Sequence, residues 1–286
     1  MTYSKIRLTV AAACLAAAPL AGAATIYGLG TDNHLYRFDS GGTAAVDIGL
    51  ISQAGIVDID FHAANGTLYG ITSTGHSYGI STTTGAATLL VTPGSALTGV
   101  QDFDFNPGAD RMRLSLVNGG NLRLIPDFIT APSPAGVAGG MVNDGFYSGA
   151  PGGVVVVGNA YTNAFDTGAS SPAPHATTLY SIGSDGVLYS HSNGAGPAGS
   201  FGVMTAVGSG LGFGLTGNVG FDISSDNNIG YVSNGNNLYT VNLATGGFTD
   251  LDGVIGAPLA SIAVPEPSTM ALGGLAGLAL LRRRRR

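Results

Sequence analysis

The sequence contains no tryptophan and only one cysteine, Cys14. Between residues 24 and 264 it also lacks lysine and glutamate, and the charged side chains there are four arginines and 16 aspartates, a net charge of −12. Without cysteine, this stretch can form neither a disulfide framework nor a cysteine-ligated zinc site. Such an acidic chain repels phosphate backbones, so we expect no nucleic-acid binding.

The N-terminus has the pattern of a secretory signal. Lys5 and Arg7 supply positive charge, residues 8–20 form an apolar run, and Ala21-Gly22-Ala23 has the small residues that signal peptidase requires. We therefore predict a signal peptide over residues 1–23, which signal peptidase removes together with the only cysteine.

The C-terminus carries a second signal. Pro265-Glu266-Pro267 precedes an apolar segment, Thr269 to Leu281, and the chain ends in five arginines. The apolar segment is short and glycine-rich for a permanent transmembrane helix, and the arginines act as a cytoplasmic stop. We therefore predict a sorting tail over residues 265–286 that anchors the chain in the membrane transiently. The alternative is a plain tail anchor.

This tail resembles the PEP-CTERM sorting signal. The resemblance implies processing by an exosortase in a Gram-negative bacterium and a place in the cell envelope, on the outer surface or outside the cell. It also implies an association with exopolysaccharide production. The proteins expected to act on the chain during export are therefore signal peptidase and exosortase.

Tyrosine pairs recur along the chain with a turn signal between the partners. Eight or nine residues separate the two members of each pair, which is typical of a β-hairpin. The pairs are Tyr27 and Tyr36, Tyr69 and Tyr78, Tyr180 and Tyr189, and Tyr231 and Tyr239. A further strand precedes the hairpins, as Asp58-Ile-Asp60, Asp102-Phe-Asp104, Asn159-Ala-Tyr161 and Gly220-Phe-Asp222.

Each unit thus contains four short strands, which is the composition of a propeller blade. We predict an all-β fold over residues 24–264: a β-propeller of five four-stranded antiparallel blades. The first unit lacks its leading strand, and Leu259–Val264 can supply it, which closes the ring. The alternatives are six blades, if insertions at residues 131–140 and 166–175 hide strands, and an open β-sandwich.

The body also resembles a known family. Phe103-Asp-Phe-Asn-Pro107 with Arg111 and Arg113, and Gly158-Asn-Ala-Tyr-Thr-Asn163, look like the signature of domain of unknown function 4394. The resemblance implies a propeller-like fold and brings no activity or site residues.

The candidate site residues are aspartates. Asp60, Asp104 and Asp222 hold matching places in strands expected to line the central channel, where a ring of carboxylates could bind a cation such as calcium. In the alternative interpretation, these aspartates and their neighbours Asp58 and Asp102 accept backbone N–H bonds and fix the packing between blades.

No catalytic constellation or cofactor motif is present. The histidines are interpreted as surface turn residues, and Arg113 is expected to form an exposed ion pair with Asp104 or Asp110. We therefore predict a non-enzymatic module that binds polysaccharide or a surface protein. The alternatives are a hydrolase or lyase with an aspartate site at the channel mouth, and a structural scaffold of the envelope or biofilm matrix.

Overall fold

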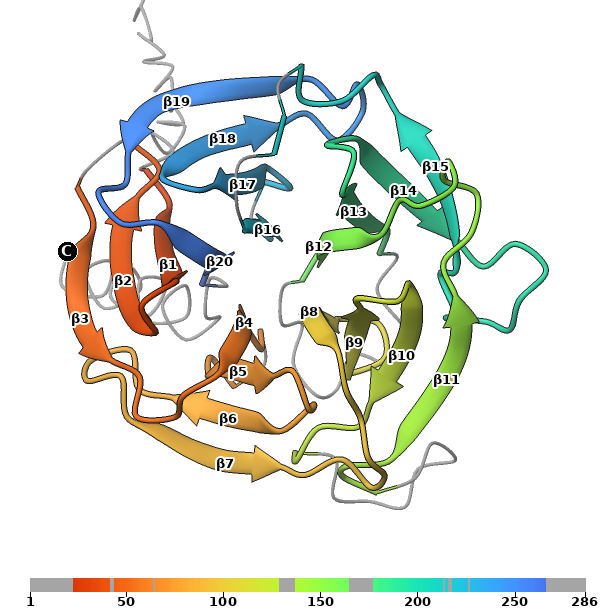
Figure 1. The fold of residues 1–286 in the computed structure, drawn as a ribbon, viewed down its shortest axis with the longest axis horizontal. Helices are drawn as coiled ribbons and strands as arrows, with labels where there is room; N and C mark the ends of the chain where they lie inside the picture. Colours follow the sequence, from red (N-terminus) through yellow and green to blue (C-terminus); the bar gives the residue numbers. More distant parts are fainter. Residues whose placement is uncertain are drawn as a thin grey trace, which may run out of the picture.

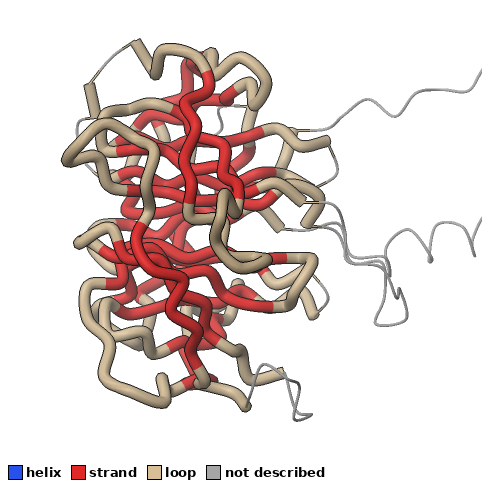
Figure 2. The backbone as a smooth tube through the Cα atoms, turned by 90° about the vertical axis from the view of Figure 1, so that its right-hand side faces the viewer, coloured by secondary structure: helices blue, strands red, loops and turns tan. Residues whose placement is uncertain are grey.

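The computed structural model describes residues 23–41, 44–63, 65–128, 137–164, 177–212, 214–215, 218–225 and 227–265. In these residues the chain forms 20 β-strands, arranged as five four-stranded antiparallel sheets around a common axis (Figure 1). From the side, the sheets form a disc with turns on both faces (Figure 2). The five-bladed propeller predicted from the sequence is confirmed.

Each blade is one sheet, and its strands follow one another from the axis to the rim. Blade 1 consists of β20 (Leu259–Ala263), β1 (Thr25–Gly30), β2 (His34–Asp39) and β3 (Val46–Leu50). Blade 2 consists of β4 (Ile56–Phe61), β5 (Leu68–Thr72), β6 (Ser77–Ile80) and β7 (Ala87–Val91). Blade 3 consists of β8 (Val100–Asn106), β9 (Arg111–Leu116), β10 (Gly120–Leu124) and β11 (Met141–Phe146). Blade 4 consists of β12 (Val156–Tyr161), β13 (Leu179–Gly183), β14 (Leu188–Ser192) and β15 (Val203–Val207). Blade 5 consists of β16 (Val219–Ile223), β17 (Gly230–Asn234), β18 (Asn237–Val241) and β19 (Phe248–Val254).

The spacing of the tyrosine pairs has a physical cause in the hairpin turns. In blade 1, Asp32 accepts the N–H of His34 at 3.1 Å and the hydroxyl of Tyr36 at 2.7 Å. In blade 4, Asp185 accepts the hydroxyl of Tyr189 at 2.7 Å. In blades 1 and 4, the second tyrosine of the pair therefore holds the hairpin turn in place through its hydroxyl group.

The hydrophobic core lies between neighbouring blades. Phe103 and Leu114 of blade 3, for example, pack with Tyr69 and Ile71 of blade 2 in one cluster, and further clusters join the other blades. Because each sheet is covered on both faces by its neighbours, the innermost strands are buried, except for a half-buried second residue in β4, β8, β12 and β20. Ring closure therefore determines how much apolar surface every blade buries.

The last strand closes the ring, as predicted. β20 pairs with β1 in antiparallel register, with Ala263 opposite Tyr27 and Ile262 opposite Gly28. Leu259 and Ile262 are 0% and 2% exposed. Blade 1 is therefore built from both ends of the ring, and β1 is paired along both of its edges.

Some predictions fall outside the described residues. These are residues 1–22 of the signal peptide, Glu266 and Pro267 of the sorting motif, the apolar tail and the insertion at 166–175; Pro265 is described. Of the insertion at 131–140, residues 137–140 are described, and there Gly94 N–H donates to Gly139 O at 2.8 Å. The described residues include no helix that could serve as a membrane span.

Candidate functional site: an axial pocket and a ring of buried aspartates

The five inner strands carry matching residues at two levels along the axis. At the lower level, each residue lies opposite the first tyrosine of its hairpin, or opposite Arg113 in blade 3. These lower-level residues are Asp60, Asp104, Ala160, Asp222 and Ala263. The upper-level residues precede them by two positions and are Asp58, Asp102, Gly158, Gly220 and Ser261.

The upper level joins blades 1, 2 and 3 each to the next blade through side-chain acceptors. The N–H of Phe103 donates to Asp58 of the preceding blade at 2.5 Å, and the N–H of Asn159 donates to Asp102 at 3.0 Å. The Ser261 hydroxyl oxygen accepts the N–H of Ile59 at 3.2 Å. Ser261 thus takes, in the closing strand, the place that an aspartate holds in blades 2 and 3.

The lower level repeats the arrangement two residues further along. Phe105 N–H donates to Asp60 at 2.9 Å, and Val264 N–H donates to Asp222 at 2.6 Å. The interpretation that the aspartates accept backbone N–H bonds and fix blade-to-blade packing is therefore confirmed for these two and for Asp58 and Asp102.

Where the upper level has glycine, the next blade comes too close for a side chain. A Cβ atom on Gly220 would lie 2.6 Å from the backbone nitrogen of Ile262, and one on Gly158 would lie 2.8 Å from the Cβ of Phe221. Both distances are shorter than van der Waals contact, so blades 4 and 5 use close backbone packing in place of a carboxylate.

The lower level brings three carboxylates together. Oxygens of Asp60, Asp104 and Asp222 all lie within 4.8 Å of one another, and each residue is at least 93% buried. Among the described residues, this is the one group of three acidic, histidine or cysteine side chains with ligand atoms so close. The sequence-based prediction of a cation at these residues stays a prediction, but the structure gives it a defined geometry.

Burial raises the pKa of two of these carboxyl groups, those of Asp60 and Asp222. It raises the pKa of Asp222 to about 6. The pKa of Asp60 lies well above its usual range, first because of burial and then because of the negative charge of Asp222. At the upper level, burial raises the pKa of Asp58 to about 7. The cluster therefore has to take up protons or a cation to compensate its charge.

This requirement predicts how stability depends on pH. Because the folded carboxyls hold protons at a pH where the unfolded chain has lost them, the free energy of unfolding should fall as the pH rises from 4 to 8 without calcium. For Asp222 alone the fall is about 3 kcal/mol. Asp222→Asn should remove that part of the slope, which urea unfolding across this pH range measures.

Adding calcium tests whether protons or a bound cation compensate the negative charge of the aspartate cluster. If a cation binds, calcium should raise the stability of the parent protein at pH 8 and leave Asp222→Asn unchanged. Burial lowers the pKa of His191 to about 4, and this histidine therefore makes the free energy of unfolding rise with pH. Because the parent and Asp222→Asn share this contribution, the test compares the pH curve of the variant with that of the parent. Asp185→Asn, in an exposed turn, is the matched control. Parallel pH curves for Asp222→Asn and the parent would contradict the prediction.

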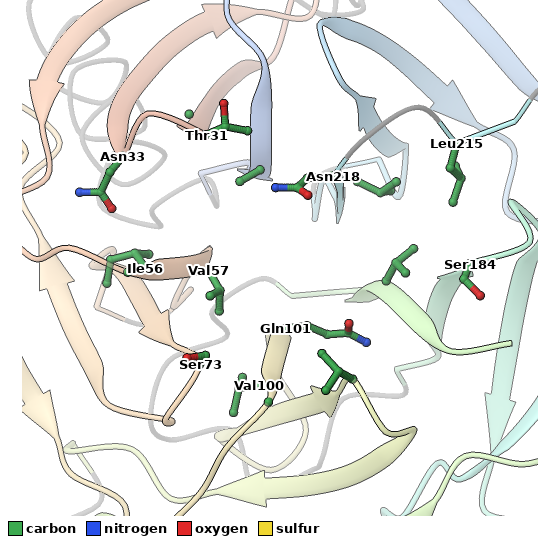
Figure 3. A pocket seen from close by; sticks show the side chains of 17 residues that line it. Thr31, Asn33, Ile56, Val57, Ser73, Val100, Gln101, Ser184, Leu215 and Asn218 are labelled. Carbon is green, nitrogen blue, oxygen red and sulfur yellow. The ribbon is translucent and has the colours of Figure 1, made fainter. Parts of the chain in front are cut away.

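A separate pocket opens at the start of the inner strands. Its volume is about 740 Å³, and all five blades contribute to its 17 lining residues (Figure 3). Val57, Gln101, Val157, Val219 and Ala260 line it from the inner strands, and the hairpin turns add residues such as Thr31 and Ser73. Asp60 lies three residues beyond Val57, about 10 Å along the strand. We call the side where the pocket opens the pocket face.

This pocket was not predicted from the sequence. The candidate site was expected at the aspartates, whereas none of the 17 lining residues is charged or aromatic. The lining combines aliphatic side chains with hydroxyl and amide groups. The sequence shows a glycine directly before β4 and β8, Gly55 and Gly99, but only the closed ring shows that the five strand starts meet.

Arg113 is placed differently from the prediction. It is fully buried, and its ion-pair partner is Asp144 on β11, with Nη1 3.1 Å from Oδ2, so the predicted exposed pair is wrong. Arg113 Nε also donates to the Tyr161 hydroxyl at 2.8 Å, and Nη1 donates to the Ser200 carbonyl at 2.9 Å. Arg113 therefore links blade 3 to the inner strand and to the β14–β15 loop of blade 4.

Two histidines also differ from the prediction of surface turns. His62 is 5% exposed, and the centroid of its ring lies 4.1 Å from that of Phe128. His191 is 7% exposed. His191 Nε2 lies 2.7 Å from the Ser181 hydroxyl oxygen. Ser181 is fully buried, so this pair joins two strands of blade 4 and is closed to a substrate. His191 lies within β14, not after it, and His62, just after β4, packs against Phe105 of the next blade, which explains the burial.

Comparison with known proteins gives two matches to families. The family described as "Domain of unknown function (DUF4394)" matches residues 40–263, and the PEP-CTERM protein-sorting motif matches residues 263–286. Both resemblances drawn from the sequence are thus confirmed. Among curated proteins, none matches the chain.

Solved structures that are similar to this chain have low sequence identity to it. A protein of unknown function from Bacteroides thetaiotaomicron VPI-5482 is 9% identical, with a TM-score of 0.48 over 85% of this chain and 67% of that one. A chain of a nidogen/laminin complex is 11% identical, with a TM-score of 0.47 over 86% and 100%. An auxiliary nutrient binding protein from Bacteroides thetaiotaomicron VPI-5482 is 13% identical, with a TM-score of 0.42 over 73% and 54%.

Proposed function

Since this chain belongs to the DUF4394 family and ends in a PEP-CTERM sorting motif, we propose that it is a non-enzymatic protein that binds polysaccharide in its axial pocket. The sorting motif implies an exported, cell-surface protein that an exosortase processes during export. As part of the proposal, signal peptidase removes residues 1–23, and the host is a Gram-negative bacterium.

The pocket is the observation that carries the proposal. Its volume of about 740 Å³ lies in the range of small-molecule and oligosaccharide sites, and its lining of aliphatic side chains with a few hydroxyl and amide groups is typical of such sites. It lies on the axis, where five rigid inner strands meet, so its shape depends little on any single loop.

A hydrolase or lyase receives less support from the same geometry. The pocket lining contains no carboxylate, histidine or cysteine that could act as acid, base or nucleophile. The aspartates lie deeper along the strands, are buried, and accept backbone N–H bonds. A scaffold without a small ligand is the remaining alternative, and the binding experiment decides between it and the proposal.

The test is direct binding of polysaccharide to the exported protein. We expect it to bind one or more surface polysaccharides on a glycan array, and the variant Val157→Trp, which fills the pocket, to bind about tenfold more weakly or not at all. Val157 lines the pocket and is half-buried, so the larger ring has room to enter it.

The matched control is Val46→Trp on β3. Val46 is 55% exposed at the rim and is not among the pocket residues, so this variant should bind like the parent. Capture of a protein partner with no polysaccharide bound, or equal binding by both tryptophan variants, would contradict the proposed function.

A further inference from the structure

We infer that the axial pocket selects sugars that carry an uncharged acetamido group, bound at the end of a polysaccharide chain. This inference rests on the proposed function and adds the class of ligand. It follows from three properties of the lining: its lack of charge, the orientation of its side-chain amides, and the kind of apolar surface it offers.

The lack of charge excludes acidic and basic sugars. All 17 lining residues are neutral, although residues 24–264 carry a net charge of −12. A carboxylate or ammonium group that enters the pocket loses hydration and gains no partner of opposite charge, which is costly. Uronic acids and free amino sugars are therefore poor ligands, and the overall acidity of the protein adds repulsion against acidic chains.

Two lining amides are fixed so that they present oxygen. Gln101 Nε2 donates across the blade interface to the carbonyl of Val156, and its oxygen turns toward the space enclosed by the pocket residues (Figure 3). Asn33 Nδ2 donates to the carbonyls of Ile51 and Gln53 at 2.9 and 3.1 Å. Both N–H donors of Asn33 and one of the two of Gln101 are thus used, and both amides offer their oxygen to N–H or O–H donors of a ligand.

The apolar part of the lining is aliphatic. Val57, Val100, Val157 and Val219 surround the axis, and none of the 17 described lining residues is aromatic. The flat apolar face of a pyranose ring usually packs on an aromatic side chain, and these residues supply none. Branched aliphatic side chains instead accommodate a group of methyl size.

An acetamido group matches all three properties. It is neutral, its N–H can donate to the Gln101 oxygen, its methyl group can pack on the valines, and its carbonyl can accept from a hydroxyl such as that of Ser73. A pocket on the axis that opens on one face admits the end of a chain more readily than its middle. The ligand class is thus a neutral polysaccharide that ends in N-acetylated sugar.

The experiment compares three tetrasaccharides that differ only at C2: tetra-N-acetylchitotetraose, its deacetylated form, and cellotetraose. Calorimetry with the exported protein should show the acetylated form binding at least about tenfold more tightly than the other two. Gln101→Leu should lose most of that preference, because the fixed acceptor is gone, and Ser73→Ala should weaken binding about threefold to tenfold while leaving the inter-blade bond of Gln101 intact.

The control variant is Thr249→Val, which removes an exposed hydroxyl on the outer strand β19, away from the pocket residues. It should bind like the parent. Equal binding of the acetylated and unacetylated tetrasaccharides, or unchanged preference in both Gln101→Leu and Ser73→Ala, would overturn the ligand class. If no polysaccharide on the array bound to the protein, the proposed function would be overturned as well. The array thus tests the proposed function, and the comparison of tetrasaccharides tests the ligand class.

Discussion

Replacing Arg113 with methionine is expected to lower the free energy of unfolding by about 3–5 kcal/mol, as measured by urea denaturation. The guanidinium is fully buried and donates to Tyr161, Asp144 and the Ser200 carbonyl. Methionine fills a similar volume but donates to none of these acceptors, and the Ser200 carbonyl keeps only the Asn121 amide, at 2.7 Å. The Asp144 carboxylate, whose side chain is fully buried, keeps only its pair with Arg123.

The control lies two residues away on the same strand. Arg111 donates to the carbonyls of Ala109 and Asp110 in its own turn, so Arg111→Met should cost about 0–1 kcal/mol. Adding Asp144→Asn to Arg113→Met should recover part of the loss, because the neutral amide no longer needs a cation. Equal destabilisation by Arg111→Met and Arg113→Met would show that the buried network contributes nothing specific.

Removing the closing strand should have a larger effect still. A chain that stops at Pro258 is expected to lose its cooperative unfolding transition, followed by circular dichroism during heating. Leu259, Ile262 and Val264 are each at least 97% buried, and together such side chains contribute about 5–9 kcal/mol. That amount is comparable to the whole stability of an ordinary domain, about 5–15 kcal/mol.

The matched control stops at Pro265 and keeps β20. It should unfold cooperatively, with a midpoint close to that of the full chain. A synthetic peptide of residues 257–265, added to the shorter chain, should restore the transition by pairing with the open edge of β1. If the chain that ends at Pro258 were as stable as the control, the ring would not depend on its closure.

The architecture was readable from the sequence because it repeats. The step of nine residues from Asp60 to Tyr69, and again from Asp222 to Tyr231, reflects a cross-strand pair that each of these blades forms in the same register. The closing strand was predictable for a related reason: the first unit lacked the strand that the others have. The residue spacing within a hairpin and the absence of a strand from a repeat can both be recognised from the order of residues alone.

The contacts between blades were not readable in this way. Asp144 lies 31 residues after Arg113, and the Ser200 carbonyl lies 87 residues after it, so nothing local marks them as partners. The burial of His62 and His191 and the pocket at the strand starts arise from the same ring geometry. The aspartates were an intermediate case, because their matching positions were visible but their N–H partners belong to the next blade.

The direction of β20 determines how the protein is displayed. Ala260 lines the pocket near the start of the strand, so Val264 comes out on the opposite side of the disc, where β1 also begins. If the segment after Val264 tethered the ring to a membrane, the opening would therefore face away from that membrane. A fluorescent tag or affinity label fused at either end would likewise leave the opening unobstructed.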